Sequence, residues 1–258
     1  MSLPSRSVNE VTLYQTLALI PPVVAGFSNI LGEALVFMVA VLTALLWEML
    51  FAGLRKSSFS AHGLTTALIV TLFCAPETAL WQIAVAISLG VVLGELIFGG
   101  RGFGFVSAAA LSLSLLIIAF PDVALRTPTP QMAALVVPGL VLLFVAGLVS
   151  VTILAGIGLG VAVLLVATGQ AIEPLAIAIA MSVGAVFLIA DPIAASVTPV
   201  GRWLYGVLAG VLVVVFSPEG VITPDAIVAA ALLASVFAPL IDQVAILIHT
   251  HLRRVQHG

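Results

Sequence analysis

Residues 132–168 read MAALVVPGLVLLFVAGLVSVTILAGIGLGVAVLLVAT, a run without a single charged side chain. A helix needs roughly 20 apolar residues to cross a bilayer, so the run is long enough for two crossings. Ser150 and Thr152 at its middle are the only polar break, so dividing the run there rests on length alone. One long tilted helix is the alternative interpretation. Strands of a membrane barrel alternate in short segments, which this run does not do.

The rest of the chain has the same character. Of its 258 residues, 62% are hydrophobic and only 7% are charged, whereas an ordinary soluble domain carries about 25% charged residues. So few charges cannot cover a water-exposed surface, and they provide no basic face for nucleic acid. The composition excludes a soluble globular enzyme, a nucleic-acid binder and a disordered chain. We predict an all-α polytopic membrane protein embedded in a lipid bilayer.

Ten apolar segments can be distinguished along the chain. The third is short and ends at Pro76. Ten crossings would divide the chain into two five-helix halves within one integral membrane domain of residues 1–258. We expect a short cytoplasmic N-terminus of residues 1–10, halves of residues 11–131 and 132–250, and a cytoplasmic tail of residues 251–258. The segments are residues 11–28, 32–53, 64–76, 79–98, 104–121, 132–148, 151–168, 174–190, 203–217 and 226–248.

The placement of charge supports this count. With ten crossings, Arg126 is the only cation on the side opposite the N-terminus, and that side also holds six acidic residues. Loops rich in Lys and Arg face the cytoplasm. We therefore expect a multi-pass membrane protein with both termini in the cytoplasm. The cations on the N-terminal side are Arg6, Arg55, Lys56, Arg101, Arg202, Arg253 and Arg254.

Two stretches predict irregular backbone at membrane depth, residues 62–76 and residues 190–199. Each combines a short apolar run with prolines, and they occupy the third and eighth segments, the same place in each half. Paired interrupted segments of this kind indicate an inverted repeat with a central site.

Four acidic residues within or beside the apolar segments are candidates for chemistry. Asp191 precedes a proline. It either has a functional role, as a ligand for an ion or proton or as the anchor of a loop that lines a cofactor, or it is the N-cap of a short turn. Asp242 should face the bundle interior and find a partner, with Arg101 or Arg202 as candidates if the fold brings them near. Glu48 and Glu95 lie near helix ends, where they can reach water or pair with Arg55 and Arg101.

Two loops could hold a ligand. The loop FGGRGFG at residues 98–104 contains Gly99, Gly100 and Arg101, and it forms either a tight helix–helix turn or a backbone wall for a flat ligand. The opposite-side loop DVALRTPTPQ at residues 122–131 places Arg126 beside Thr127 and Thr129. That group could hold a phosphate, or the loop could be a plain proline-stiffened connection.

The sequence shows no self-contained catalytic site: it has no nucleophile elbow, phosphate-binding loop or paired-carboxylate motif. One cysteine, Cys74, and four histidines provide no cluster for a metal site. From the residues alone, a transporter and an electron-transfer subunit remain equally open.

Four motifs in order resemble one family of membrane subunits. They are LGELIFGGRG at residues 93–102, ADPIAASVTPVGRWLYG at residues 190–206, PEG at residues 218–220 and ASVFAPLID at residues 234–242. The family comprises the B subunit of sodium-translocating NADH:quinone reductase and the D subunit of the Rnf complex, and the resemblance covers roughly residues 35–250.

This resemblance implies ten spanning helices in two inverted halves, with cytoplasmic termini. It also implies a place in a multi-subunit electron transport complex that moves sodium or protons, with FMN or riboflavin as cofactor and quinone as a further partner. Asp191, Thr198 and Arg202 would form one wall of the cofactor site, with Gly99, Gly100 and Arg101 opposite.

The chain departs from the family pattern where flavin is attached. No Ser-Gly-Ala-Thr motif occurs, and the corresponding loop is the short RTPTP at residues 126–130. After the glycine loop, GFVSAA at residues 104–109 lacks the two asparagines and the proline of the family, and Glu95 replaces its lysine. We therefore expect a divergent member with a non-covalent flavin, and Thr129 or Thr127 is the acceptor only if attachment is covalent.

The leading hypothesis is thus an electron-transfer subunit of the Rnf or sodium-NQR type. The alternative is a flavin-free paralogue that acts as a transporter, channel or scaffold on the same fold, since fold does not fix function. A structural subunit that docks a soluble redox partner on its arginine-rich cytoplasmic face is a third hypothesis.

Overall fold

The computed structural model describes residues 7–27, 29–56, 59–170, 173–217 and 221–257, and the side chains of residues 249–257 are not described. Within these ranges the chain is helical and contains no β-strand, only an isolated bridge between Cys74 and Leu125. The Pro218–Gly220 motif lies outside the described residues. The helices are α1 (Val8–Gly26), α2 (Ile30–Arg55), α3 (Gly63–Phe73), α4 (Leu80–Gly94), η1 (Leu96–Phe98), α5 (Ala108–Ala119), α6 (Pro130–Val145), α7 (Val151–Thr168), α8 (Pro174–Gly184), η2 (Ala185–Ile189), α9 (Pro199–Phe216) and α10 (Pro224–His257).

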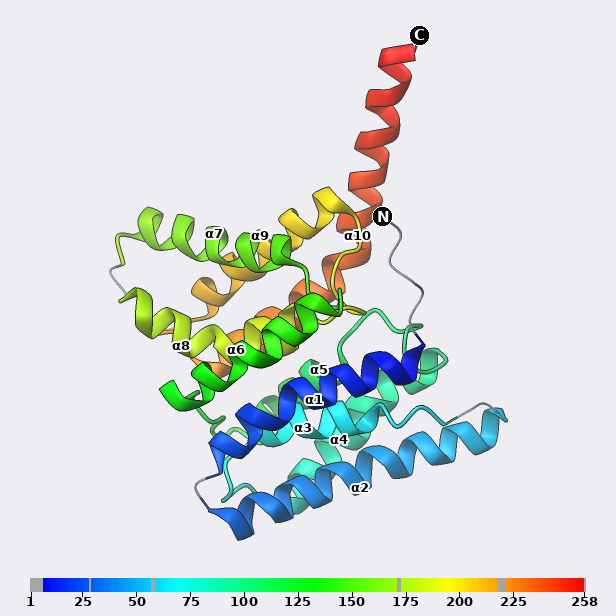
Figure 1. The fold of residues 1–258 in the computed structure, drawn as a ribbon, viewed down its shortest axis with the longest axis vertical. Coiled ribbons are helices and arrows are strands. Elements are labelled where there is room, and N and C mark those ends of the chain that lie inside the picture. Colours follow the sequence, from blue (N-terminus) through cyan, green and yellow to red (C-terminus); the bar gives the residue numbers. More distant parts are fainter. Residues whose placement is uncertain (1–6, 28, 57–58, 171–172, 218–220, 258) are drawn as a thin grey trace.

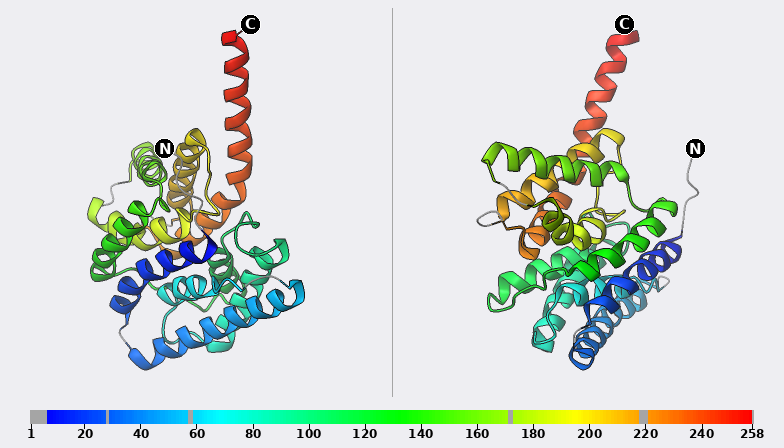
Figure 2. Two further views of the ribbon diagram at one scale, coloured as in Figure 1. Left: turned by 45° about the vertical axis from the view of Figure 1, so that its right-hand side comes forward. Right: turned by 60° about the vertical axis from the view of Figure 1, so that its left-hand side comes forward.

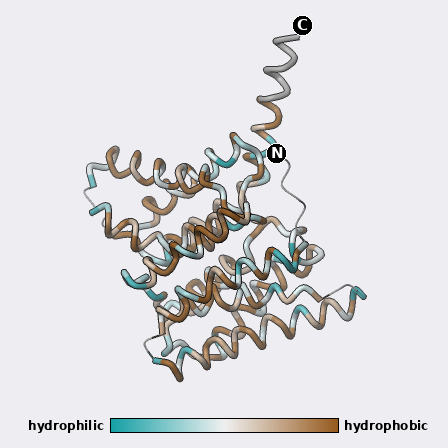
Figure 3. Tube along the Cα trace, in the orientation of Figure 1, coloured by the Kyte–Doolittle hydropathy of each residue, from teal (hydrophilic) through white to brown (hydrophobic). Residues whose placement is uncertain are grey.

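The prediction of an all-α polytopic membrane protein is confirmed. Five helical segments are long and apolar enough to cross a bilayer: Ile30–Arg55, Leu80–Phe98, Val151–Thr168, Pro199–Phe216 and Pro224–Ile248. Four more are apolar but shorter, and α1 belongs to neither group because its first half is polar. The hydrophilic residues gather at helix ends and connections (Figure 3). Ten crossings therefore remain a prediction.

The uncharged run at residues 132–168 forms two helices. Helix α6 ends at Val145 and α7 begins at Val151, so the division on length is confirmed and the single tilted helix is wrong. The turn between them uses Gly147, whose φ of 70° lies in the left-handed region that glycine adopts without strain.

Most helix contacts of the first predicted half recur in the second, although the extensive contact of α2 with α3 is matched only by a slight contact of α7 with η2. Helix α1 contacts α3, α2 contacts α4, and α5 contacts both α3 and α4. Five helices later, α6 contacts α8, α7 contacts α9, and α10 contacts both α8 and α9. The halves meet through α1 against α6 and α5 against α10, and the last part of α10 projects from the bundle in every view (Figures 1 and 2).

Helices α7 and α9 approach each other closely through glycine. Each helix carries two glycines four residues apart. Gly156 and Gly160 on α7 face Gly206 and Gly210 on α9. A Cβ atom at Gly160 would collide with the Val207 carbonyl, and one at Gly210 with the Ile157 carbonyl. Small residues at this spacing let helix backbones meet in a membrane, where packing replaces the hydrophobic effect as the driving force.

The predicted irregular backbone is found at residues 190–198, whereas residues 62–76 are mostly the regular helix α3 with irregular backbone only at its two ends. Helix α3 stops after Phe73, and α8 continues as the π-helix η2 before residues 190–198 leave helical geometry. We call the end of the bundle where α1 begins the N-terminal end, and the end where α1 finishes at Gly26 the opposite end.

Candidate functional site

A loop of three glycines turns Arg101 into the protein at the N-terminal end. Gly99, Gly100 and Gly102 have φ values of 129°, 99° and 93°, which side chains with a Cβ rarely adopt. The Gly100 N–H donates to the Glu95 carbonyl at 3.1 Å and so folds the loop back on the end of α4. The Arg101 side chain is only 7% exposed. The loop is thus a tight turn that places the Arg101 side chain inside the protein.

Asp191 is the partner that the fold brings to Arg101. It follows the π-helix η2, and its Oδ1 atom lies 3.3 Å from Arg101 Nη2. The same oxygen accepts from the Ile193 N–H at 3.2 Å. The carboxylate therefore caps a turn and also binds a charged group of the other half, while its role as an ion, proton or cofactor-loop ligand stays a prediction.

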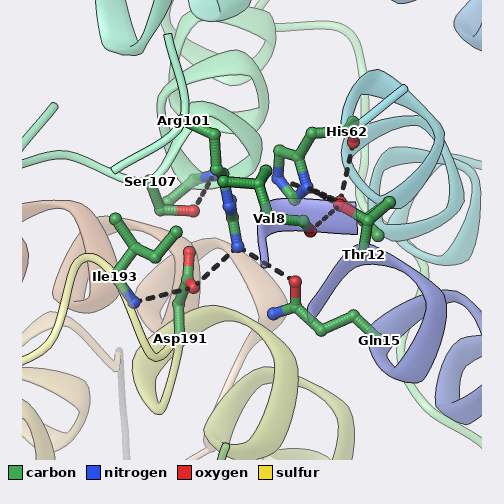
Figure 4. Close-up of polar contacts among 10 residues, drawn as sticks. Val8, Thr12, Gln15, His62, Arg101, Ser107, Asp191 and Ile193 are labelled. Carbon is green, nitrogen blue, oxygen red and sulfur yellow. Dashed lines mark hydrogen bonds and ion pairs between the residues drawn. The ribbon is translucent and has the colours of Figure 1, made fainter. Parts of the chain in front are cut away.

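A small chamber lies beside this ion pair, between the halves. Gln15 of α1 accepts from Arg101 Nη2 at 3.0 Å, and Figure 4 shows Arg101 reaching between Gln15 and Asp191. The chamber volume is about 10 Å³, close to that of a single water site. Arg101 Nε is buried and has no hydrogen-bond partner among the described residues. The lining residues are Gln15, His62, Thr65, Thr66, Ile69, Arg101, Ser107, Ala109 and Asp191.

His62 closes the α3 side of the chamber. Its ring Nδ1 lies 2.9 Å from the Thr65 hydroxyl and 3.4 Å from that of Thr12.

Glu48 lies inside the protein, so the interpretation that it reaches water is wrong. Its Oε1 atom accepts from the Gly63 N–H at 2.8 Å and satisfies the start of α3, while Oε2 is buried without a partner among the described residues. Glu95 is also buried. Arg55 is not paired with Glu48 in the structure, and it donates to the Leu96 carbonyl instead.

An open groove adjoins the chamber at the N-terminal end. Its volume is about 380 Å³, and Arg101 lines both the groove and the chamber. Glu48, Gly99 and Gly100 also line it, together with three phenylalanines and the start of α1. The aromatic and polar lining matches what small-molecule sites in proteins use. The phenylalanines are Phe51, Phe59 and Phe103.

Thr198 and Arg202 lie apart from this groove. Asp242 accepts from the Ser196 hydroxyl at 2.5 Å, from the Thr198 hydroxyl at 2.6 Å, and from the backbone N–H groups of Val197 and Thr198 at 3.0 Å each. The partner of Asp242 is therefore the loop that begins α9, and neither candidate arginine reaches it. Arg202 lines a second cavity together with Ser196 and Val197.

Arg126 belongs to the opposite end. It donates from Nη2 to Glu33 at 2.7 Å and from Nη1 to the Gly26 carbonyl at 2.8 Å, and its backbone N–H donates to Phe73 at 2.7 Å. Thr129 is the N-cap of α6, where its hydroxyl accepts from Met132 N–H at 3.2 Å. Thr127 lines an apolar cavity.

The predicted residues thus fall into three places, and some contributors were missed. Gly99, Gly100, Arg101 and Asp191 come together, Thr198 and Arg202 lie beside the second cavity, and Arg126, Thr127 and Thr129 lie at the opposite end. Gln15 and Glu33 were not singled out as site residues. For Glu33 the available signal was an acidic side chain in a largely apolar helix, because such residues need partners in a membrane.

Comparison with known proteins identifies relatives of this architecture. The sequence model of the NQR2, RnfD, RnfE family matches residues 3–132 and 127–248. The B subunit of the Na(+)-translocating NADH-quinone reductase of Pseudomonas aeruginosa is 28% identical over 268 residues, which cover 82% of this chain and 66% of the relative. Proteins of the same name from Klebsiella pneumoniae and Azotobacter vinelandii are each 28% identical and cover 78% and 76% of this chain. The chain spans slightly less than two thirds of the length of these relatives.

Proposed function

The chain belongs to the NQR2, RnfD, RnfE family, and from this premise we propose that it is a membrane subunit of an Rnf- or sodium-NQR-like electron transport complex. In this proposal it passes electrons through a flavin, and the complex couples that transfer to ion translocation. Other membrane and peripheral subunits are its partners, and quinone is the acceptor class.

The groove beside Arg101 is the observation that carries this proposal. Its volume of about 380 Å³ lies within the range of small-molecule sites. Arg101 and Glu48 both line the groove, so a guanidinium donor and a carboxylate acceptor lie in its wall. A flat ring with both donor and acceptor edges, such as the isoalloxazine of riboflavin, fits this combination with Phe51, Phe59 and Phe103.

The opposite end does not fit the phosphate of a covalently bound FMN. Both terminal nitrogens of Arg126 are already bonded, to Glu33 and to the Gly26 carbonyl. The Thr129 hydroxyl is occupied as a helix cap. We therefore propose a non-covalent, uncharged flavin at the N-terminal end. A bound flavin supplies one-electron and two-electron redox chemistry.

The residues of this chain would position the ring and set its electrostatic surroundings. Arg101 would donate to an acceptor edge of the ring and favour negative charge there, while Glu48 would accept from a donor edge. The three phenylalanines would exclude water from the faces of the ring.

Purification in detergent tests the flavin. Bound flavin should give visible absorbance near the protein peak in size-exclusion chromatography, and denaturation should release it. Arg101→Met should lose most of the flavin, whereas Arg202→Gln, which also removes one cation, should retain it. A fluorescent band that survives denaturing electrophoresis and disappears in Thr129→Ala would instead show covalent attachment. Absence of flavin with partner subunits present would overturn the proposal.

We further propose that the halves at residues 11–131 and 132–250 are related by inversion in a bacterial inner membrane, with both termini in the cytoplasm. The recurrence of most helix contacts of α1–α5 in α6–α10 supports the repeat. Arg55, Arg101 and Arg202 line cavities at the N-terminal end, which supports the cytoplasmic orientation of that end. Reporter fusions at Gly258 and within residues 122–131 should therefore lie in different compartments.

A flavin-free transporter on the same fold is the second candidate. The polar chamber between the interrupted segments α3 and α8–η2 favours it, because transporters place binding sites where broken helices meet. Solute flux into proteoliposomes that hold the chain alone, without any redox partner, would support this candidate over electron transfer.

A further inference from the structure

We propose that the Arg101–Asp191 ion pair is a latch between the two halves of the bundle, and that it closes the chamber, which has room for one water molecule, against the groove at the N-terminal end. The latch does not require a bound flavin, so it can be tested independently of the proposed function.

The position of the ion pair supports a latch. Arg101 belongs to the first half and Asp191 to the second, and the bond spans 3.3 Å between segments 90 residues apart in the chain. Arg101 is the one described residue that lines both the groove and the chamber, so it lies where the two spaces adjoin. Moving this one side chain would join the two spaces.

The chamber is built for a polar occupant. Gln15, His62, Thr65 and Ser107 line it from three separate segments, which are α1, the start of α3 and the start of α5, and each carries a hydrogen-bonding group. Arg101 Nε, on a side chain more than nine-tenths buried, has no partner among the described residues. A water needs two to four polar partners and about this much space, and the volume of about 10 Å³ excludes anything larger.

The geometry around the latch allows it to open. Both Arg101 bonds come from the single atom Nη2, at 3.0 and 3.3 Å, and they are longer than a typical charge-assisted bond of about 2.7–2.9 Å. Glu48, which lines the groove, also attracts Arg101. The guanidinium therefore has one carboxylate in the groove wall and another in the chamber wall.

Cysteine accessibility tests the latch. The reporter is Thr66→Cys, which places a thiol in the chamber wall, in a Cys74→Ala background that removes the only native thiol. A membrane-impermeant methanethiosulfonate cation is applied at the N-terminal end. Asp191→Asn conserves the side-chain volume while it removes the charge, so its effect reports the ion pair rather than a void. We expect it to raise the labelling rate about tenfold through easier local opening.

Three further variants make the outcome decisive. Arg101→Met should raise the labelling rate like Asp191→Asn, while the charge exchange Arg101→Asp with Asp191→Arg should restore protection at least in part. Arg202→Gln removes a cation from the same end without touching the chamber and should leave the rate unchanged. A rate in Asp191→Asn equal to that of the reporter alone, in protein that elutes as a folded monodisperse peak, would overturn the latch. Full labelling of the reporter alone would overturn it too.

Discussion

The two ends of α1 each carry a buried arginine–carboxylate pair, and the pairs are built differently. At the opposite end, Arg126 uses two nitrogens, on Glu33 at 2.7 Å and on the Gly26 carbonyl at 2.8 Å. At the N-terminal end, Arg101 makes both its bonds from one nitrogen, at 3.0 and 3.3 Å, and Nε is left over. The first pair is a structural staple of one half and its connection. The Arg101–Asp191 pair joins both halves, and it leaves the Arg101 Nε–H, which has no partner among the described residues, free to donate to a bound molecule.

The largest expected effect is at the staple. Arg126→Met leaves the buried Glu33 carboxylate without its guanidinium, and breaking a buried pair costs about 3–5 kcal/mol. Thermal unfolding in detergent should show this loss. The double variant with Glu33→Met should recover much of it, because apolar replacement of both partners is often neutral. A loss below about 1 kcal/mol for Arg126→Met would remove the contrast between the two ends.

Asp242 tests whether a carboxylate at the N-terminal end can stabilise the fold without a cation. Asp242→Ala removes the four hydrogen bonds that the carboxylate accepts from Ser196, Val197 and Thr198, and these bonds hold the loop before α9 in place. We expect a loss of about 2 kcal/mol in the same unfolding measurement. Asp242→Asn, which retains one carbonyl oxygen, should lose less. Equal losses in the two variants would contradict this account.

Asp191→Asn should cost less than Arg126→Met, about 1.5–2 kcal/mol. The amide oxygen can still accept from the Ile193 N–H, and Arg101 retains Gln15 and the nearby Glu48 and Glu95. Unfolding curves of the two single variants, recorded side by side, give the comparison. A larger loss in Asp191→Asn would mean that the N-terminal pair is the main staple.

The smallest effect concerns a helix cap at the opposite end. Thr129→Ala removes the acceptor for the Met132 N–H at the start of α6, which should cost about 1 kcal/mol. Thr127→Ala is the matched control, because Thr127 caps no helix, and its stability should stay within about 0.5 kcal/mol of the unsubstituted chain. Equal losses in the two variants would contradict the cap assignment.

Sequence reasoning succeeded where the signal is local. The uncharged run at residues 132–168 indicated two helices, and the prolines near residues 76 and 192 indicated interrupted segments. The partners of Arg126 and Asp242 could not be found in this way, because Glu33 is 93 residues from Arg126 and Ser196 is 46 residues from Asp242. The π-helix was also hidden, since the carbonyl of Ile189 is satisfied by the Tyr205 hydroxyl from another helix.

The glycine contact between α7 and α9 has a mechanical consequence. The backbones of α7 and α9 touch, so neither helix can slide or tilt without the other. We therefore expect the two helices to move as one rigid body. If α7 and α9 moved, the backbone would bend in the π-helix η2 and in residues 190–198, which connect η2 to the start of α9. Asp191 lies within this connecting segment, so movement of α7 and α9 would act directly on its ion pair with Arg101.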